Sequence, residues 1–299
     1  MRENLTLQHR ATEVLVSLIN FPVLPDTRDS YERQISPRPT TGGKRTMTTT
    51  SYARPIDRTV RIETGGVLIE ADWTMPIDPR GIVIFAQGSG GSRFSRRNRM
   101  VARELYNQSF GSLMVDLLTP DEEREDMLTA ALRLDVSLLA ERLIGTASWV
   151  KEEAETGWLP VGYFGTGIGA AAALIAAARK PDLVDAIVSR GGRPDLAGVA
   201  VNKVKAPTLL IVPGADLQAL ALNRWAYWRM DCERKFEVVR GATPRFDEGG
   251  VFDTATALTT KWFDQQLMAH GREMLWRADL NDSDGSLFGV GKAVRHERV

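Results

Sequence analysis

The chain has 299 residues and a mass of 33.1 kDa, with 43% hydrophobic and 25% charged residues. This composition is typical of a folded globular protein and disfavours a disordered, collagen-like or coiled-coil chain. The 38 Lys and Arg balance the 38 Asp and Glu, so the net charge gives no reason to expect binding to nucleic acid or to an anionic membrane. The single cysteine, Cys232, excludes an internal disulfide and a thiolate zinc cluster and favours a reducing, cytoplasmic location.

Residues 1–57 are expected to form a short amphipathic helix followed by a flexible arm. From Asp26 to about Pro55 the sequence is rich in Ser, Thr, Pro and Gly, so it offers little apolar surface to offset chain entropy. No run of the chain reaches the roughly 18 apolar residues that a membrane span needs. The first residues also lack the long apolar block of a secretory signal.

From Thr59 onward, short apolar runs alternate with helical patterns. Two runs of alternating apolar and polar residues flank Gly65 and Gly66, which is typical of an antiparallel hairpin. The later runs are apolar at nearly every position, which indicates strands buried on both faces of a parallel sheet; they cover 81–86, 112–118, 160–164, 185–189, 208–212 and 235–239. Helical patterns cover 97–107, 130–155, 168–179, 217–229 and 250–269.

These patterns predict the α/β fold class: a mainly parallel sheet with helices on both faces and an N-terminal antiparallel hairpin. We expect this single domain to span residues 58–270. The sequence after it, 271–299, is polar and rich in Gly and Asp, so we expect a loosely attached tail.

Sheets of this kind bind ligands at the carboxyl ends of their strands, and three turns there carry candidate chemistry. Gln87, Gly88 and Ser89 open a glycine-rich loop whose backbone N–H groups could face an anion or an oxyanion. The stretch from Gly165 to Gly169 joins a strand to a helix with small residues at both flanks, as in the Gly-x-Nuc-x-Gly nucleophile elbow. A carboxylate, Asp216, follows the strand at 208–212.

From about Arg58 to Met268, the chain resembles the dienelactone hydrolase-like branch of the α/β-hydrolases. The stretches that carry the resemblance are FAQGSGGSRFSRRNR, VGYFGTGIGAAAALIAAA, VSRGGRPDLAG, APTLLIVPGAD and VVRGATPRFDE. The resemblance implies the α/β-hydrolase fold, a family that hydrolyses esters or lactones, and no cofactor or metal. It also implies where the catalytic positions lie: the nucleophile at Gly167, the acid at Asp216 and the base at Pro244.

Only the acid position keeps a functional side chain. Glycine has no group that attacks a carbonyl, and proline cannot accept or donate a proton, so Gly167 and Pro244 cannot complete a Ser-His-Asp cycle. Gln87 stands where the family commonly has a histidine. The histidines of the chain lie outside the strand-end loops; they are His9, His270 and His296.

The sequence therefore predicts a family member that has lost hydrolysis and that binds a small carboxylate or lactone-like ligand, or regulates an active relative. The remaining site would comprise Gln87, Gly88, Ser89, the N–H of Ile168, Asp216 and the turn around Pro244. One alternative is an active ester or lactone hydrolase with an unforeseen nucleophile. Another is a nucleotide site at the turn from Gly165 to Ala170, with Ser189-Arg190 about 20 residues later to accept a phosphate. No nucleic-acid or membrane partner is expected, and an oligomer is left open.

Two charged segments need an interpretation. Four arginines follow the glycine-rich loop closely: Arg93, Arg96, Arg97 and Arg99. They form either a solvated helix face or a positive patch that attracts an anionic ligand.

The acidic run from Asp121 to Asp126 follows Thr119-Pro120. It is expected to begin a helix, where the dipole favours carboxylates, rather than to bind metal.

Overall fold

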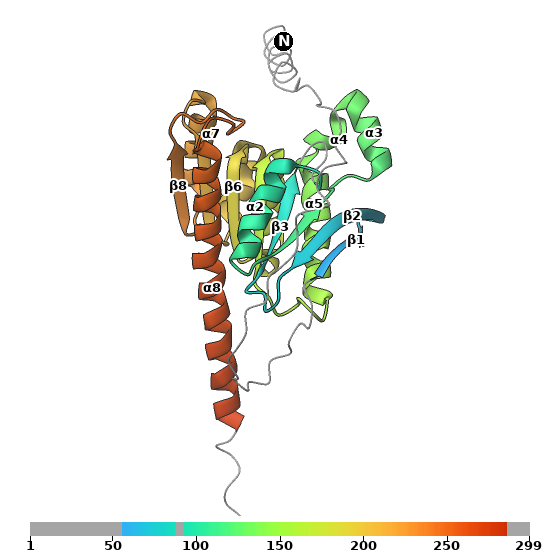
Figure 1. Ribbon diagram of the computed structural model, residues 1–299, viewed down its shortest axis with the longest axis vertical. Helices are drawn as coiled ribbons and strands as arrows, with labels where there is room; N and C mark the ends of the chain where they lie inside the picture. The colour runs from blue at the N-terminus through green and yellow to red at the C-terminus, as the bar shows by residue number, and fades with distance from the viewer. Residues whose placement is uncertain (1–55, 88–92, 286–299) are drawn as a thin grey trace, which may run out of the picture. The chain divides into compact units, whose positions relative to one another are not determined.

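The computed structural model describes residues 56–87 and 93–285, with side chains as far as residue 268. The strands of this part form one sheet in the order β1-β2-β4-β3-β5-β6-β7-β8 (Figure 1). Their bounds are β1 (Ile56–Thr64), β2 (Val67–Met75), β3 (Ile82–Gln87), β4 (Gly111–Val115), β5 (Val161–Gly167), β6 (Ala186–Gly192), β7 (Thr208–Pro213) and β8 (Arg234–Val239). The pairs β1·β2 and β2·β4 are antiparallel, and the other pairs are parallel. The predicted fold class is confirmed.

The N-terminal hairpin forms where the sequence places it. Thr64 pairs with Val67, and the turn between them consists of Gly65 and Gly66, with φ of 57° and 77°. Two successive positive φ values are what a two-residue hairpin turn with the correct twist requires, and glycine adopts them without strain.

Helices cover both faces of the sheet. On one face, α2 (Arg96–Asn107) and α8 (Val251–Gly285) bury their apolar side chains with β3, β5, β6 and β7, and Figure 1 shows both in front of the sheet. On the other face lie α5 (Val136–Glu152), α6 (Ile168–Arg179) and α7 (Leu217–Arg229). The remaining helices are α3 (Pro120–Thr129), α4 (Ala131–Leu134), and two 3₁₀ segments, η1 (Pro181–Leu183) and η2 (Pro194–Lys203).

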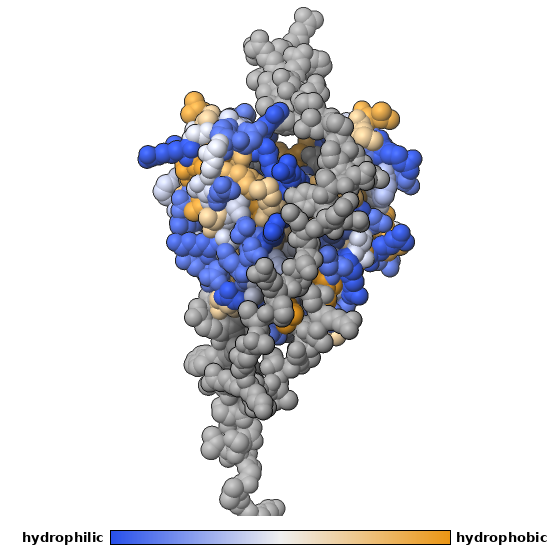
Figure 2. All heavy atoms as spheres, viewed as in Figure 1, coloured by the Kyte–Doolittle hydropathy of each residue, from blue (hydrophilic) through white to orange (hydrophobic). Residues whose placement is uncertain are grey.

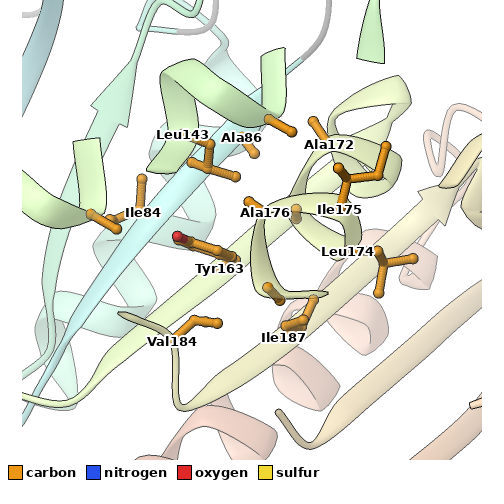
Figure 3. Close-up of a cluster of buried hydrophobic side chains, with 14 of the residues drawn as sticks. Ile84, Ala86, Leu143, Tyr163, Ala172, Leu174, Ile175, Ala176, Val184 and Ile187 are labelled. Atoms are coloured by element: carbon orange, nitrogen blue, oxygen red, sulfur yellow. The ribbon is translucent and has the colours of Figure 1, made fainter. Parts of the chain in front are cut away.

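The larger apolar cluster packs α5 and α6 against the middle of the sheet. Tyr163 of β5 lies there with Ile84, Leu143 and Ala176 around it (Figure 3). Burial, with a smaller contribution from Asp185, raises the pKa of the Tyr163 hydroxyl well above its ordinary value. The alanines of α6 are small enough to let this helix approach the strands closely, which fixes where α6 begins at the carboxyl end of β5.

Two predicted helix boundaries are wrong. The single helix expected at 130–155 is divided, because Ala130 has a φ of 54° and Asp135 accepts hydrogen bonds from the N–H groups of Ser137 and Leu138, which begins α5. The last helix was expected to end at 269, but α8 continues to Gly285, so residues 271–285 of the expected tail are helical. This stretch contains the helix formers Arg, Glu, Met, Leu and Ala, and polarity alone does not end a helix.

The expected N-terminal helix and arm lie outside the described residues, apart from Ile56 and Asp57 in β1. In the view of Figure 2, hydrophilic residues make up most of the visible described surface, with smaller hydrophobic patches between them. No helix in the described ranges is long and apolar enough to cross a bilayer.

The acidic run begins a helix, as predicted. Thr119 and Glu122 form a reciprocal capping box at the start of α3, in which the Thr119 N–H donates to Glu122 Oε2 at 2.8 Å. Glu122 Oε1 also accepts a 2.8 Å hydrogen bond from the guanidinium of Arg142, whose side chain is only 3% exposed. Among the described residues, no cluster of three or more His, Cys, Asp or Glu side chains could hold a metal ion.

Replacing Glu122 by Gln is expected to reduce the free energy of unfolding by about 2 kcal/mol at pH 7, because it leaves the buried Arg142 charge without a full countercharge. Burial alone would raise the pKa of Glu122, but hydrogen bonds from Thr119 and Arg142 outweigh it and hold that pKa below 4.5. The contribution of Glu122 is therefore fully present above pH 4.5 and is lost as the pH falls through its lower folded-state pKa. Urea unfolding between pH 3 and 7 measures this: the difference between wild type and Glu122→Gln should shrink in acid, and a constant difference would contradict the prediction.

Candidate functional site

The turn between β5 and α6 has the backbone geometry of a nucleophile elbow. β5 ends at Gly167, and α6 begins at the next residue, Ile168. Gly167 has a φ of 52° and a ψ of −123°, a combination that is strained for any residue with a side chain. A strained residue between a strand and a helix is the feature that exposes the nucleophile in α/β-hydrolases.

The small residues on either side of Gly167 are required by packing. A Cβ atom at Gly165 would lie 2.5 Å from the Cα of Ala170, and one at Gly169 would overlap the carbonyl of Ala86. At Gly167, by contrast, a Cβ would meet no heavy atom of the described residues within 4 Å. The described residues therefore leave room for a side chain at position 167, where the chain has glycine.

The acid and base positions lie on neighbouring loops at the same edge of the sheet. Asp216 follows β7 and forms the N-cap of α7, where its Oδ1 accepts a 2.9 Å hydrogen bond from the Ala219 N–H. The loop after β7 is joined to the loop after β8 by the Ala215 N–H, which donates to the Ala242 carbonyl at 3.0 Å. Pro244, two residues further on, is exposed.

Arg193 links the elbow to the segment that follows β6. The Arg193 N–H donates to the Gly167 carbonyl at 2.9 Å, which connects this residue to the elbow. The Arg193 guanidinium forms two hydrogen bonds with Asp195. These bonds and, to a lesser extent, the charge of Asp216 raise the pKa of Arg193. Asp216 therefore caps α7, and the Arg193 guanidinium is bound by Asp195.

Of the predicted oxyanion loop, only the first residue is described. Gln87 ends β3 and accepts a 2.5 Å hydrogen bond from Asn98 Nδ2 of α2. Gly88 and Ser89 lie outside the described residues. The N–H of Ile168 is at the start of α6, a helix whose N-cap, Gly167, provides no side-chain hydrogen bond.

Of the arginines behind that loop, Arg96 and Arg99 are exposed on α2, as expected for a solvated helix face, but Arg93 differs from both interpretations of the sequence. Arg93 is neither solvated nor open to a ligand, because its guanidinium forms ion pairs at 2.5 Å with Asp116, 2.6 Å with Glu70 and 3.4 Å with Asp72. Arg99 also pairs with Asp72, at 3.5 Å. The hairpin supplies two of these carboxylates, which a pattern along one segment could not show.

One buried cation, Arg190, was considered in the sequence only as part of a nucleotide site. It lies near the end of β6, and its residue is 7% exposed. Its side chain is on the same face of the strand as the core residue Val188 two positions earlier, because side chains alternate along a strand. The sequence could have indicated that Arg190 is buried, because it directly follows the apolar run 185–189 and shares a strand face with Val188.

Two further side chains of the described residues are poor candidates for a nucleophile. The hydroxyl of Ser189 is fully buried. Cys232 precedes β8, at the opposite edge of the parallel strands, and burial raises the pKa of its thiol, which disfavours the reactive thiolate. None of the histidines has a described side chain.

Comparison with known proteins gives the same fold. No family model matches the chain. The crystal structure of a dienelactone hydrolase from Anabaena variabilis is 43% identical, with a TM-score of 0.70, and the match covers 71% of this chain and 99% of that one. Est1E from Butyrivibrio proteoclasticus has a TM-score of 0.58 at 14% identity, covering 70% of this chain and 98% of that one.

Two curated proteins, one from each of two strains of Mycobacterium tuberculosis, are named "Putative phosphoribosyl transferase". Each is 46% identical to this chain over 215 residues. The match takes in 72% of this chain but 48% of each relative, so this chain spans about half of their length. The Anabaena protein, in contrast, is covered almost completely and at high identity. The chain therefore belongs to the dienelactone hydrolase-like branch of the α/β-hydrolases.

Proposed function

We propose that this chain is a catalytically inactive member of its family that binds a small molecule at the carboxyl edge of the sheet. The observation that carries the proposal is the elbow: its backbone conformation is present, and the described residues leave room for a side chain, but the residue is Gly167. The base position on the adjoining loop, Pro244, lacks a titratable group as well. Backbone donors at the start of α6 can still bind a polar ligand, but without a nucleophile and a base they support only residual catalysis.

We also propose that the protein is cytoplasmic. A cytoplasmic location is supported by the presence of one cysteine, which is buried. We further propose a small carboxylate or lactone-like ligand as the partner, in place of nucleic acid or membrane, with regulation of an active relative as one use of such binding.

Wild-type protein is expected to hydrolyse p-nitrophenyl acetate and dihydrocoumarin no faster than the Gly167→Ala variant. Binding and oxyanion donors alone leave at most roughly 10³- to 10⁴-fold acceleration over water, and no acyl intermediate forms without a nucleophile. Stopped-flow kinetics should show no burst. Saturable turnover with a burst, retained in Gly167→Ala, would instead establish an active hydrolase with another nucleophile.

The name of the Mycobacterium relatives supports a second candidate, a phosphorylated nucleotide-like ligand at the turn from Gly165 to Ala170. The uncapped start of α6 agrees with it, since helix N-termini bind phosphate. Against it, Gly165 and Gly169 are needed for contacts within the chain itself. A rise in melting temperature with phosphoribosyl pyrophosphate that Gly167→Asp abolishes would favour this candidate; no rise is expected from the first.

A further inference from the structure

The Arg190 guanidinium is buried and has no countercharge among the described residues. Its Nη1 has no hydrogen-bond partner there, and no ion pair joins this side chain to another described residue. Its nearest aromatic neighbours are Phe164 and Phe252, whose ring centroids lie 5.1 Å and 5.2 Å from the guanidinium carbon. Two cation–π contacts offset only part of the cost of removing a charge from water.

The electrostatic surroundings of Arg190 are unfavourable for a cation. Burial, together with the nearby positive charge of Arg97, lowers the pKa of Arg190 to about 10. The group is still protonated at neutral pH, and no ion pair with a described residue neutralises its charge. Arg97 itself has a partner, Asp247, at 3.6 Å.

Arg190 is also adjacent to the empty elbow. In the register of β5 and β6, Arg190 pairs with Thr166, the residue before Gly167. No described atom would lie within 4 Å of a Cβ at Gly167. A ligand at this edge of the sheet would therefore have, on the next strand, a guanidinium that no described residue pairs with.

We propose that Arg190 anchors the carboxylate of an organic acid bound at the carboxyl edge of the sheet beside Gly167. One unpaired positive charge is neutralised by one negative charge, and a guanidinium fits a carboxylate through two parallel hydrogen bonds. A phosphate dianion would introduce a second negative charge for which Arg97, already paired, is not free. This inference rests on the proposed function, since it names the ligand class of the same site.

The test is thermal unfolding of the full chain with acetate, benzoate or phenylacetate, at constant ionic strength set by chloride. At least one of these is expected to raise the melting temperature of the wild type by about 2–5 °C near saturation. The rise should vanish in Arg190→Met. It should persist in Arg124→Met, a control that removes a positive charge from an arginine whose side chain is 72% exposed.

Without any added acid, Arg190→Met is expected to melt at the wild-type temperature or above it, because the variant removes an uncompensated buried charge. If Arg190→Met does not fold, Arg190→Lys serves instead: it keeps the charge but loses the paired hydrogen bonds, so its apparent affinity for the same acid should fall about tenfold. Calorimetric titration of the wild type and Arg190→Lys measures that ratio.

Three results would overturn the inference: no shift with any of the acids, a shift of equal size in Arg190→Met, or a larger Arg190-dependent shift with phenyl phosphate than with benzoate. Ester turnover by the wild type would refute the proposed function in a separate assay. Such turnover would leave an Arg190-dependent shift with benzoate in place, so the two failures are distinguishable.

Discussion

The double variant Gly167→Ser with Pro244→His is expected to hydrolyse p-nitrophenyl acetate with a kcat/KM at least about 100-fold above that of the wild type. A positioned general base contributes roughly 10²- to 10⁴-fold, and it acts only when a nucleophile is present to be deprotonated. Each single variant should therefore stay within a few-fold of the wild type, because members of a triad act as a unit. Steady-state kinetics on all three variants measures this.

The fold leaves room for both side chains. The backbone at Gly167 already has the elbow conformation, and a Cβ there meets no described atom within 4 Å. Asp216 uses Oδ1 for the Ala219 N–H, which leaves Oδ2 to accept a hydrogen bond from a histidine on the adjoining loop. Pro244 is exposed, so its replacement by a longer side chain does not disturb the core.

Two control variants test whether the gain in activity needs the base and the acid. Gly167→Ser with Pro244→Ala supplies the hydroxyl without the base and should remain inactive. Adding Asp216→Asn to the double variant should remove most of the gain, since the acid orients the imidazole. A folded double variant with wild-type activity would show that Arg193, or another change at this edge, prevents assembly of the triad.

The elbow, the N-terminal hairpin and the two-sided burial of the sheet could be predicted because each depends on residues close together in the sequence. Continuous apolar runs indicate buried parallel strands, and the paired glycines at Gly65 and Gly66 determine a hairpin. The role of Arg93 could not be predicted in this way. Its carboxylate partners come from β2 and from the residue after β4, and only the sheet brings them together.

Arg190 illustrates a different limit. The alternative nucleotide interpretation used Ser189-Arg190 as a phosphate acceptor, but the sequence does not show that the Arg190 guanidinium will have two phenyl rings and another arginine as its neighbours. A buried charge without a partner is a departure from the rules that build the rest of the core. Departures of this kind are found mainly at functional sites, because natural selection tolerates their energetic cost only where they are used.

Glycine at the elbow also has a consequence for stability. A residue with a side chain at a φ of 52° and a ψ of −123° costs of order 1–3 kcal/mol, and glycine does not. Gly167 therefore keeps the elbow conformation without backbone strain. A protein with glycine at this position does not need compensating changes in its core to retain the fold.

The glycines of the elbow allow a direct test of which parts of it are structural. Gly169→Ala is expected to lower the free energy of unfolding by about 3 kcal/mol or more, because the new Cβ would overlap the carbonyl of Ala86 in β3 and neither backbone can move without separating α6 from the sheet. Urea unfolding followed by circular dichroism measures the change. In a domain of this size, the melting temperature should fall by roughly 6–12 °C.

Two matched variants separate steric overlap from backbone strain. In Gly167→Ala the new Cβ has space but the backbone φ is unfavourable, so we expect the free energy of unfolding to fall by about 1–2 kcal/mol. Gly249→Ala has free space and a φ outside the left-handed region, so its stability should stay within about 0.5 kcal/mol of the wild type. If Gly167→Ala and Gly169→Ala lowered the free energy of unfolding equally, the first turn of α6 would not pack against β3 as closely as described. We expect the destabilisation to decrease in the order Gly169→Ala, Gly167→Ala, Gly249→Ala. This order follows if the small residues that flank the elbow hold α6 against the sheet, while Gly167 makes no packing contact of that kind.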